Sequence, residues 1–289
     1  MFLKTFLLAS VGFPLFMGGI AALLFSRKQI CSKTSGLLFH SVLPGSIQPN
    51  LSCLSQRRFS KIIDYLKHRR YSSITIKEAA LTNDQLQSQI MITFDDGFQS
   101  IYDYALPVLD NAGFKATIFC VTDFIGKSSS WDVYGQSRHL DNNSIYNLSK
   151  MGHEIGSHTC THANLPYLSD KDLIRELRDS KSKLEDITGK EVKSISFPHG
   201  SWDKRVWKKV CEAGYTSAST YRNHVFSENF RLFPVYGVYQ FDSPDSVFRR
   251  IKQNEHSFSL SYAISSLMPH FAKGTPVWKF RKNYQIFPD

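Results

Sequence analysis

Several features are absent from this 289-residue sequence, and each absence narrows the class of protein. There is no internal repeat and no low-complexity tract, which argues against a repeat array and against a disordered chain of biased composition. The five cysteines show no regular spacing, so their pattern predicts no disulfide framework. Cys120 and Cys211 fall in strand-like and helical segments that suit buried thiols, and a Cys31–Cys53 pair is left open.

The chain also lacks a recognised nucleic-acid-binding motif, although 35 Lys and Arg against 25 Asp and Glu give it a formal net charge of +10. We therefore expect no nucleic-acid partner. A solvated basic face is the default interpretation, and the excess of positive charge favours anionic lipid head groups or acidic envelope polymers as partners. The sequence gives no sign of the oligomeric state.

The order of apolar and polar segments predicts an α/β protein. Hydrophobic residues make up 42% of the chain, enough to bury a substantial core. Strand-like runs alternate with helical stretches, which is typical of a parallel architecture. The predicted strands are 36–39, 73–76, 90–94, 115–121, 153–157 and 194–197; the predicted helices are 59–68, 100–111, 170–188 and one that follows Ser201 and stops at Gly214.

Two adjacent carboxylates stand in the most informative segment, Thr93-Phe94-Asp95-Asp96-Gly97. They follow an apolar run, so a buried strand would present both acids at its carboxyl end, where parallel α/β folds keep their chemistry. Neighbouring side chains point different ways, so one acid can bind a metal while the other faces the substrate. We assign Asp96 to the metal and Asp95 to the general base. Asp-Asp-Gly alone is also typical of a plain turn.

Two histidines four residues apart follow another strand-like run, in Ser157-His158-Thr159-Cys160-Thr161-His162. One carboxylate with two imidazoles forms a facial metal site with open positions. Because this motif and the acidic pair occur together, each after a strand-like run, a metal site is favoured over surface or core histidines. Cys160 is not expected to be a ligand, since the positions between the two histidines point away from an ion that both bind.

A third segment, Ser194-Ile195-Ser196-Phe197-Pro198-His199-Gly200, is again strand-like and breaks at its proline and glycine. Glycine lets the backbone approach a ligand closely, so the amides around His199 and Gly200 are candidate donors to a developing oxyanion. We therefore place Pro198 and Gly200 among the substrate-binding residues and His199 among the catalytic ones. Pro-His-Gly alone is also a common turn.

Taken in order, these motifs resemble those of the polysaccharide deacetylases with NodB homology, carbohydrate esterase family 4. The resemblance runs from about Leu37 to Val238 through Leu38–Val42, Thr93–Gly97, Ala105–Leu109, Ala116–Phe119, Gly152–Thr159, Phe197–Gly200 and Ala213–Tyr215. It implies a distorted parallel (β/α) barrel and metal-dependent removal of acetyl groups from N-acetylglucosamine units. The substrate implied is thus a glycan that contains N-acetylglucosamine.

Carried over residue by residue, the resemblance implies roles for the motif residues. Asp95 is the general base, the amide near His199 is part of the oxyanion hole, and the metal ligands are Asp96, His158 and His162. The metal implied is a divalent cation, Zn²⁺ first, with Co²⁺ or Ni²⁺ as alternatives.

The family usually carries its general acid as the histidine of a Leu-x-His element near the end of the domain. We find no convincing copy of that element in this sequence. The branch that resembles the poly-β-1,6-N-acetylglucosamine deacetylases carries a histidine on the first strand instead. Leu38-Phe39-His40-Ser41-Val42 fits that pattern. We therefore predict His40 as the general acid, against the alternative of a histidine that only packs near the strand end.

Two positions in the third segment depart from the family pattern. The motif usually begins with an arginine that steadies the catalytic aspartate, whereas this chain has Ser196. A tether for Asp95 is therefore missing or supplied elsewhere. The aromatic residue usually found before the glycine is replaced by His199, which is open to two interpretations: a side chain that lines the sugar pocket, or a fourth metal contact.

The amino-terminal segment 6–25 is a run of 20 uncharged, mostly apolar residues, long enough to cross a bilayer of about 30 Å. We predict a hydrophobic anchor helix within residues 1–30, with the catalytic domain outside the cytoplasm. Secretion after signal cleavage is one alternative. A domain that faces the cytoplasm is the other, and the charges beside the segment slightly favour it.

The sequence thus divides into the segment 1–30, a catalytic domain at 31–240 and a basic extension at 241–289 of unknown role. The predicted function is N-deacetylation of a glycan. The alternatives are an O-acetyl esterase or small-amide hydrolase on the same scaffold, and a non-catalytic carbohydrate-binding module. The intact set of two aspartates and two histidines argues against the non-catalytic module.

Overall fold

The computed structural model describes residues 36–45, 51–82, 88–129, 137–220 and 230–252, all within the compact unit 33–289. Seven parallel strands of this unit form a closed ring, because each pairs with the next and the last pairs with the first. This ring confirms the predicted parallel (β/α) barrel. In ring order the strands are β1 (Gly36–Phe39), β5 (Gln89–Phe94), β6 (Thr117–Cys120), β9 (Glu154–Ser157), β10 (Ser194–Ser196), β11 (Ser217–Thr220) and β12 (Arg231–Gly237).

An eighth strand of the same sheet, β4 (Ser72–Ile74), pairs with the first half of β5, whereas β6 pairs with the end of β5. The strand β5 therefore changes partner along its length. Two short strand pairs lie outside the ring: β2 (Ser41–Leu43) with β3 (Cys53–Ser55), and β7 (Ser128–Ser129) with β8 (Ser137–Arg138).

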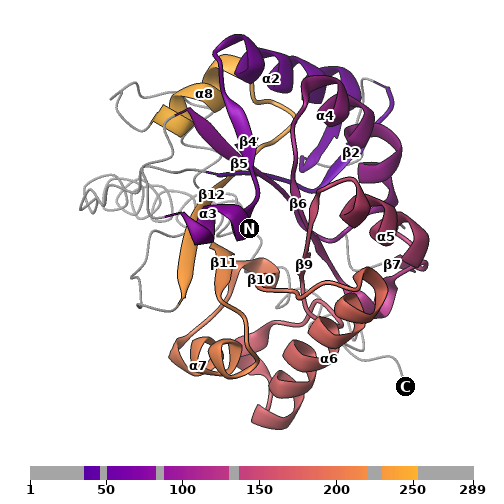
Figure 1. Ribbon diagram of the computed structural model, residues 1–289, viewed down its shortest axis with the longest axis vertical. Helices are drawn as coiled ribbons and strands as arrows, with labels where there is room; N and C mark the ends of the chain where they lie inside the picture. The colour runs from indigo at the N-terminus through magenta and orange to yellow at the C-terminus, as the bar shows by residue number, and fades with distance from the viewer. Residues whose placement is uncertain (1–35, 46–50, 83–87, 130–136, 221–229, 253–289) are drawn as a thin grey trace, which may run out of the picture. The chain divides into compact units, whose positions relative to one another are not determined.

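Helices surround the ring (Figure 1): α2 (Gln56–His68), α4 (Leu106–Ala112), α5 (Asn142–Lys150), α6 (Asp170–Thr188) and α7 (Lys204–Glu212). In four of them a side-chain oxygen accepts a backbone N–H of the first turn, which caps the helix. The caps are Ser55, Asp141, Ser169 and Asp203. The shorter elements are α3 (Ile76–Leu81), α8 (Pro244–Lys252), the π-helix η1 (Ile101–Ala105) and the 3₁₀ turns η2 (Thr122–Phe124), η3 (Leu165–Tyr167) and η4 (Pro198–Gly200).

The predicted helix 170–188 coincides with α6, since its cap Ser169 and its terminal Gly189, at φ 64°, are both read from the sequence. The predicted helix 100–111 is instead divided between η1 and α4, and a proline stands in the first turn of α4. The predicted strand 73–76 ends earlier, because Thr75 caps α3 in a capping box with Glu78.

Two kinds of strand build the core. The strand β5 is apolar and buried almost throughout, as expected for a parallel strand covered on both faces. In contrast, β10 and β11 carry small hydroxyl residues, and the Ser194 and Ser217 hydroxyls hydrogen-bond each other at 2.8 Å.

Cys120 is buried as predicted, but Cys211 is exposed on α7, so the prediction that Cys211 is buried is wrong. Cys31 lies outside the described residues.

The part of the C-terminal extension that the structure describes packs on α2. The Phe248 ring on α8 lies 5.6 Å from the Tyr65 ring on α2, and the Tyr65 hydroxyl donates to Asp245 at 3.2 Å. Arg58 donates to the Asp242 carbonyl at 2.8 Å, and the buried Asp242 carboxylate pairs with Arg250. Residues 241–252 therefore pack against α2, while the predicted domain boundary at residue 240 stays a prediction.

The predicted location of the protein needs correction. Within the described ranges, no helix has both the length and the apolar character needed to cross a bilayer. The segment 6–25, on which the anchored and extracytoplasmic location depended, lies outside those ranges. We therefore withdraw the predicted membrane anchoring.

Candidate active site

Four strand ends bring the predicted site residues to one end of the barrel. His40 follows β1, the pair Asp95 and Asp96 follows β5, and His158 follows β9. The turn η4, which contains His199, follows β10. Because all these strands are parallel, their carboxyl ends lie at the same rim, where side chains of separate segments can meet.

The structure brings Asp96, His158 and His162 together as a candidate metal site. One ligand atom of each residue lies within 4.8 Å of the others. The Asp96 Oδ1 atom is 3.7 Å from His158 Nε2 and 3.4 Å from His162 Nε2. Two ligand atoms about 2.1 Å from one tetrahedral ion lie about 3.4 Å apart, so these spacings fit a shared cation.

His158 is held in the form that a metal ligand needs. Its Nδ1 donates to the Ser196 carbonyl at 2.8 Å, which turns Nε2 toward Asp96. Since a carbonyl only accepts, the proton belongs on Nδ1 and the lone pair on Nε2. Burial lowers the pKa of His158 to about 4, against the raising effect of the Ser196 hydrogen bond. The ring is therefore neutral at pH 7, as metal coordination requires.

Left-handed backbone geometry concentrates at this rim. Among non-glycine residues, the φ angle is 68° at Asp96, 69° at Thr159, 62° at His162 and 59° at His199. Such angles cost free energy, and they are typical of functional sites where surrounding contacts hold the backbone in place. The backbone of the site is thus in a strained geometry that contacts with the rest of the fold must maintain.

Glu176 holds the loop between the two histidines, a role that the sequence analysis missed. Its carboxylate, fully buried on α6, accepts the N–H groups of Cys160 at 2.8 Å and Thr161 at 2.9 Å. It also accepts the Thr161 hydroxyl at 2.7 Å. The feature of the sequence that could have indicated this role is a carboxylate on the apolar face of the helix, next to Leu177.

Replacing Glu176 is expected to damage both stability and metal binding. Glu176→Ala leaves the buried N–H of Cys160 and the part-buried N–H of Thr161 without an acceptor. This loss costs about 2–4 kcal/mol of unfolding free energy, and it frees the loop that carries His162. Urea unfolding and Zn²⁺ titration calorimetry measure the two effects. Asp179→Asn, at an exposed position on the same helix, is the matched control. Unchanged stability in Glu176→Ala would contradict the anchoring role.

Asp95 lies beside the cluster without belonging to the group of three ligands. It is 4% exposed, and its Oδ2 accepts the Ser196 hydroxyl at 2.9 Å. Burial raises the pKa of Asp95 to about 6, while His40 and the Ser196 hydrogen bond act to lower it. The tether for Asp95, which the sequence left as missing or supplied elsewhere, is thus the hydroxyl of Ser196, the residue that stands in place of the arginine.

His40 lies close enough to Asp95 and His158 for both to act on its charge. Burial lowers the pKa of His40, the Asp95 carboxylate raises it, and His158 lowers it further. The side chain is therefore part of the same polar group at the rim. Its role as the general acid stays a prediction.

The turn η4 closes one side of the site. The ring of His199 lies 4.6 Å from the ring of His162, edge to face. The Gly200 amide donates to the Phe197 carbonyl at 2.8 Å, so this amide is already used within the turn. Pro198 is buried and Gly200 is half-buried. The oxyanion role thus stays a prediction for the amide of His199.

Cys160 faces away from the candidate metal site. Its Sγ lies 3.6 Å from the Glu176 carbonyl and 3.9 Å from the Arg175 carbonyl on α6. Burial raises the pKa of this thiol to about 12. Cys160 is therefore a protonated packing residue, in agreement with the expectation that it is not a ligand.

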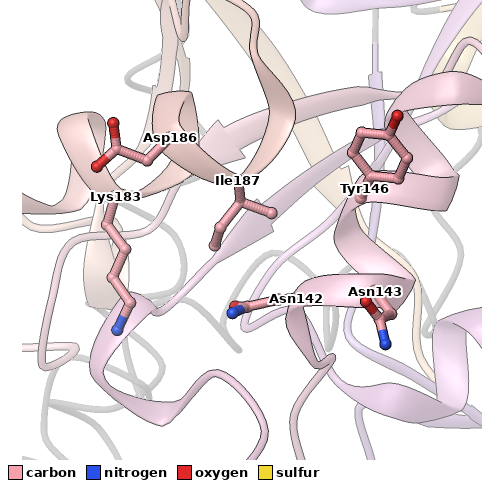
Figure 2. A pocket seen from close by; sticks show the side chains of 6 residues that line it. All are labelled: Asn142, Asn143, Tyr146, Lys183, Asp186 and Ile187. Atoms are coloured by element: carbon pink, nitrogen blue, oxygen red, sulfur yellow. The ribbon is translucent and has the colours of Figure 1, made fainter.

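A surface groove of about 470 Å³ lies elsewhere, between α5 and α6. Figure 2 shows Asn142, Asn143 and Tyr146 on one helix opposite Lys183, Asp186 and Ile187 on the other. None of these residues belongs to the metal cluster or its neighbours at the rim. The groove is thus separate from the candidate active site.

Known proteins resemble this chain in sequence and in fold. A model of the family described as polysaccharide deacetylase matches residues 82–218. The Bacillus subtilis protein named "Putative polysaccharide deacetylase YxkH" is 30% identical over 206 residues, which cover 70% of this chain and 69% of that protein. The poly-beta-1,6-N-acetyl-D-glucosamine N-deacetylase of Staphylococcus epidermidis is 24% identical over 172 residues, 56% of this chain and 59% of that protein.

A solved structure of a deacetylase has a similar fold. The Streptococcus pyogenes deacetylase PplD, solved in complex with acetate, superposes with a TM-score of 0.65 at 20% identity and covers 75% of this chain and 97% of its own. The fold is thus shared, and the relative that is 30% identical confirms the family that the motifs indicated. The chain belongs to the polysaccharide deacetylase family and is a hydrolase of that family.

Proposed function

We propose that this protein is a metal-dependent hydrolase that removes N-acetyl groups from polysaccharides or oligosaccharides containing N-acetylglucosamine. The observation that carries the proposal is the group Asp96, His158 and His162, with its ligand atoms within 4.8 Å of one another and the separate carboxylate of Asp95 beside it. The name of the Staphylococcus epidermidis relative, a poly-beta-1,6-N-acetyl-D-glucosamine N-deacetylase, supports this choice of substrate.

The three ligands would hold a divalent cation, with Zn²⁺ as the first candidate and Co²⁺ or Ni²⁺ as alternatives. When bound, such a cation supplies Lewis-acid activation of water and of a carbonyl group. Asp95, fixed through Oδ2, would accept the proton of the attacking water at Oδ1, which has no hydrogen-bond partner among the described residues. The amide of His199 would donate to the carbonyl oxygen as negative charge develops there.

His40 would complete the reaction by giving a proton to the nitrogen as the carbon–nitrogen bond breaks. Water then supplies the oxygen of acetate, and the sugar keeps a free amine. The charge of Asp95 acts on the pKa of His40, which supports a place for His40 in the same polar group as the proposed proton acceptor.

Acetate release from chitin oligomers, poly-N-acetylglucosamine and peptidoglycan, with and without chelator, tests the proposal. At least one of these substrates is expected to release acetate, with the activity lost on chelation and restored by Zn²⁺ or Co²⁺. If none releases acetate after the metal is restored, a carbohydrate-binding module becomes the better account. If acetate comes only from O-acetylated sugars, the protein is an esterase on the same scaffold.

The role of His40 predicts a difference between two kinds of substrate. An amine is a poor leaving group unless it is protonated, whereas the phenolate of an aryl acetate leaves without a proton. His40→Ala is therefore expected to lower kcat on an N-acetyl sugar by about 100-fold or more and to change aryl acetate hydrolysis much less. Equal losses on both substrates would instead indicate a role in holding Asp95.

A further inference from the structure

Ser196 makes two contacts that no other described residue combines. It is the last residue of β10 and is 3% exposed. Its hydroxyl donates to Asp95 Oδ2 at 2.9 Å, and its carbonyl accepts from His158 Nδ1 at 2.8 Å. One residue therefore touches both the proposed proton acceptor and a proposed metal ligand, which follow two other strands.

The hydroxyl contact decides where the Asp95 carboxylate points. Asp95 Oδ2 lies 3.9 Å from His158 Nε2, not far beyond the 3.7 Å that separates this nitrogen from Asp96 Oδ1. A rotation of the Asp95 side chain would thus bring it among the ligand atoms. The Ser196 hydroxyl, bound to Oδ2, opposes that rotation and leaves Oδ1 without a hydrogen-bond partner among the described residues.

We propose that Ser196 is a positioning residue that keeps Asp95 as a proton acceptor and out of the metal's ligand set, while its backbone carbonyl orients His158. This inference rests on the proposed function. The two contacts are separable by mutation, because a side-chain substitution removes the hydroxyl and leaves the carbonyl in place.

Ser196→Ala is therefore expected to lower kcat for acetate release by about 10- to 100-fold, the rate equivalent of one lost hydrogen bond to a charged group. The KM is expected to stay within about 3-fold. The Zn²⁺ affinity, measured by calorimetry, is not expected to fall, since the His158 contact remains. Ser196→Thr, which keeps a hydroxyl, is expected to recover most of the lost kcat.

A matched control lies on the next strand. Ser219 of β11 is the register partner of Ser196, is 2% exposed, and its hydroxyl has no hydrogen-bond partner among the described residues. Ser219→Ala removes the same oxygen at the same level of the barrel and is expected to leave kcat and Zn²⁺ affinity unchanged. Thermal unfolding of each variant confirms that the fold is kept.

Three results would overturn the inference: full kcat in Ser196→Ala, an equal loss in Ser219→Ala, or a loss of Zn²⁺ affinity that accompanies the loss of kcat in Ser196→Ala. A wild-type protein that releases no acetate from any substrate with the metal restored refutes the proposed function as well. An active wild-type protein with a fully active Ser196→Ala variant refutes this inference alone.

Discussion

Asp95→Asn is expected to lower kcat for acetate release by about 100- to 10,000-fold, the range over which a general base contributes to catalysis. Asparagine has nearly the same shape as aspartate, and its amide oxygen can still accept from the Ser196 hydroxyl that now binds Asp95 Oδ2 at 2.9 Å. It does not take a proton from water at neutral pH. The variant therefore isolates the basicity of Asp95 from its place in the structure.

Zn²⁺ binding separates this role of Asp95 from that of a ligand. Asp95→Asn is expected to bind Zn²⁺ with an affinity close to that of the wild type, as calorimetry would show, because Asp95 is outside the group Asp96, His158 and His162. Asp186→Asn, in the groove between α5 and α6, is the control and is expected to keep full turnover. A large loss of Zn²⁺ affinity in Asp95→Asn would show that the two aspartates have been assigned the wrong way round.

His162→Ala is expected to weaken Zn²⁺ binding by more than about 100-fold, beyond the 10- to 100-fold typical of residues that only support a ligand. Acetate release is expected to fall with the bound metal. His162 is only partly buried, so its removal disturbs the core less than removal of the buried His158. Metal content after dialysis and titration calorimetry measure the effect, with the exposed His68→Ala as the control.

His199→Ala decides between the two interpretations of that residue. The His199 ring packs edge to face on the His162 ring at 4.6 Å, and it lies outside the group of three ligands. We expect His199→Ala to raise KM for the glycan and to leave Zn²⁺ affinity within about 3-fold of the wild type. A Zn²⁺ affinity as low as that of His162→Ala would make His199 a fourth ligand.

The sequence was sufficient to predict an element or a site residue where a local pattern of residue types is compatible with few structures. An apolar strand that ends on Asp95 and Asp96, and a helix between the cap Ser169 and the left-handed Gly189, leave few alternatives. The parallel order of these strands then brings Asp96 next to His158 and His162, although more than 60 residues separate them in the chain. The site residues were therefore predictable from local patterns and the barrel together.

The sequence was insufficient to predict the role of a residue where that role depends on contacts with residues far away in the chain. The strand β11 reads Ser-Ala-Ser-Thr and has no apolar run that would predict a strand, yet all four residues are buried in the barrel. In the sequence, Glu176 is one of many charged residues on α6, and only the structure shows that its carboxylate accepts the Cys160 N–H. In the sequence, Ser196 stands where the family motif usually has an arginine, and only the structure shows that its hydroxyl donates to Asp95.

The most direct test of the central claim is anomalous X-ray diffraction at the zinc absorption edge from crystals of the wild-type protein grown with Zn²⁺. The account predicts one peak in the barrel, about 2.0–2.2 Å from Asp96, His158 and His162, with Asp95 beyond bonding distance and still joined to Ser196. A peak bound by other residues, or one that includes Asp95 among its ligands in place of Asp96, would contradict it.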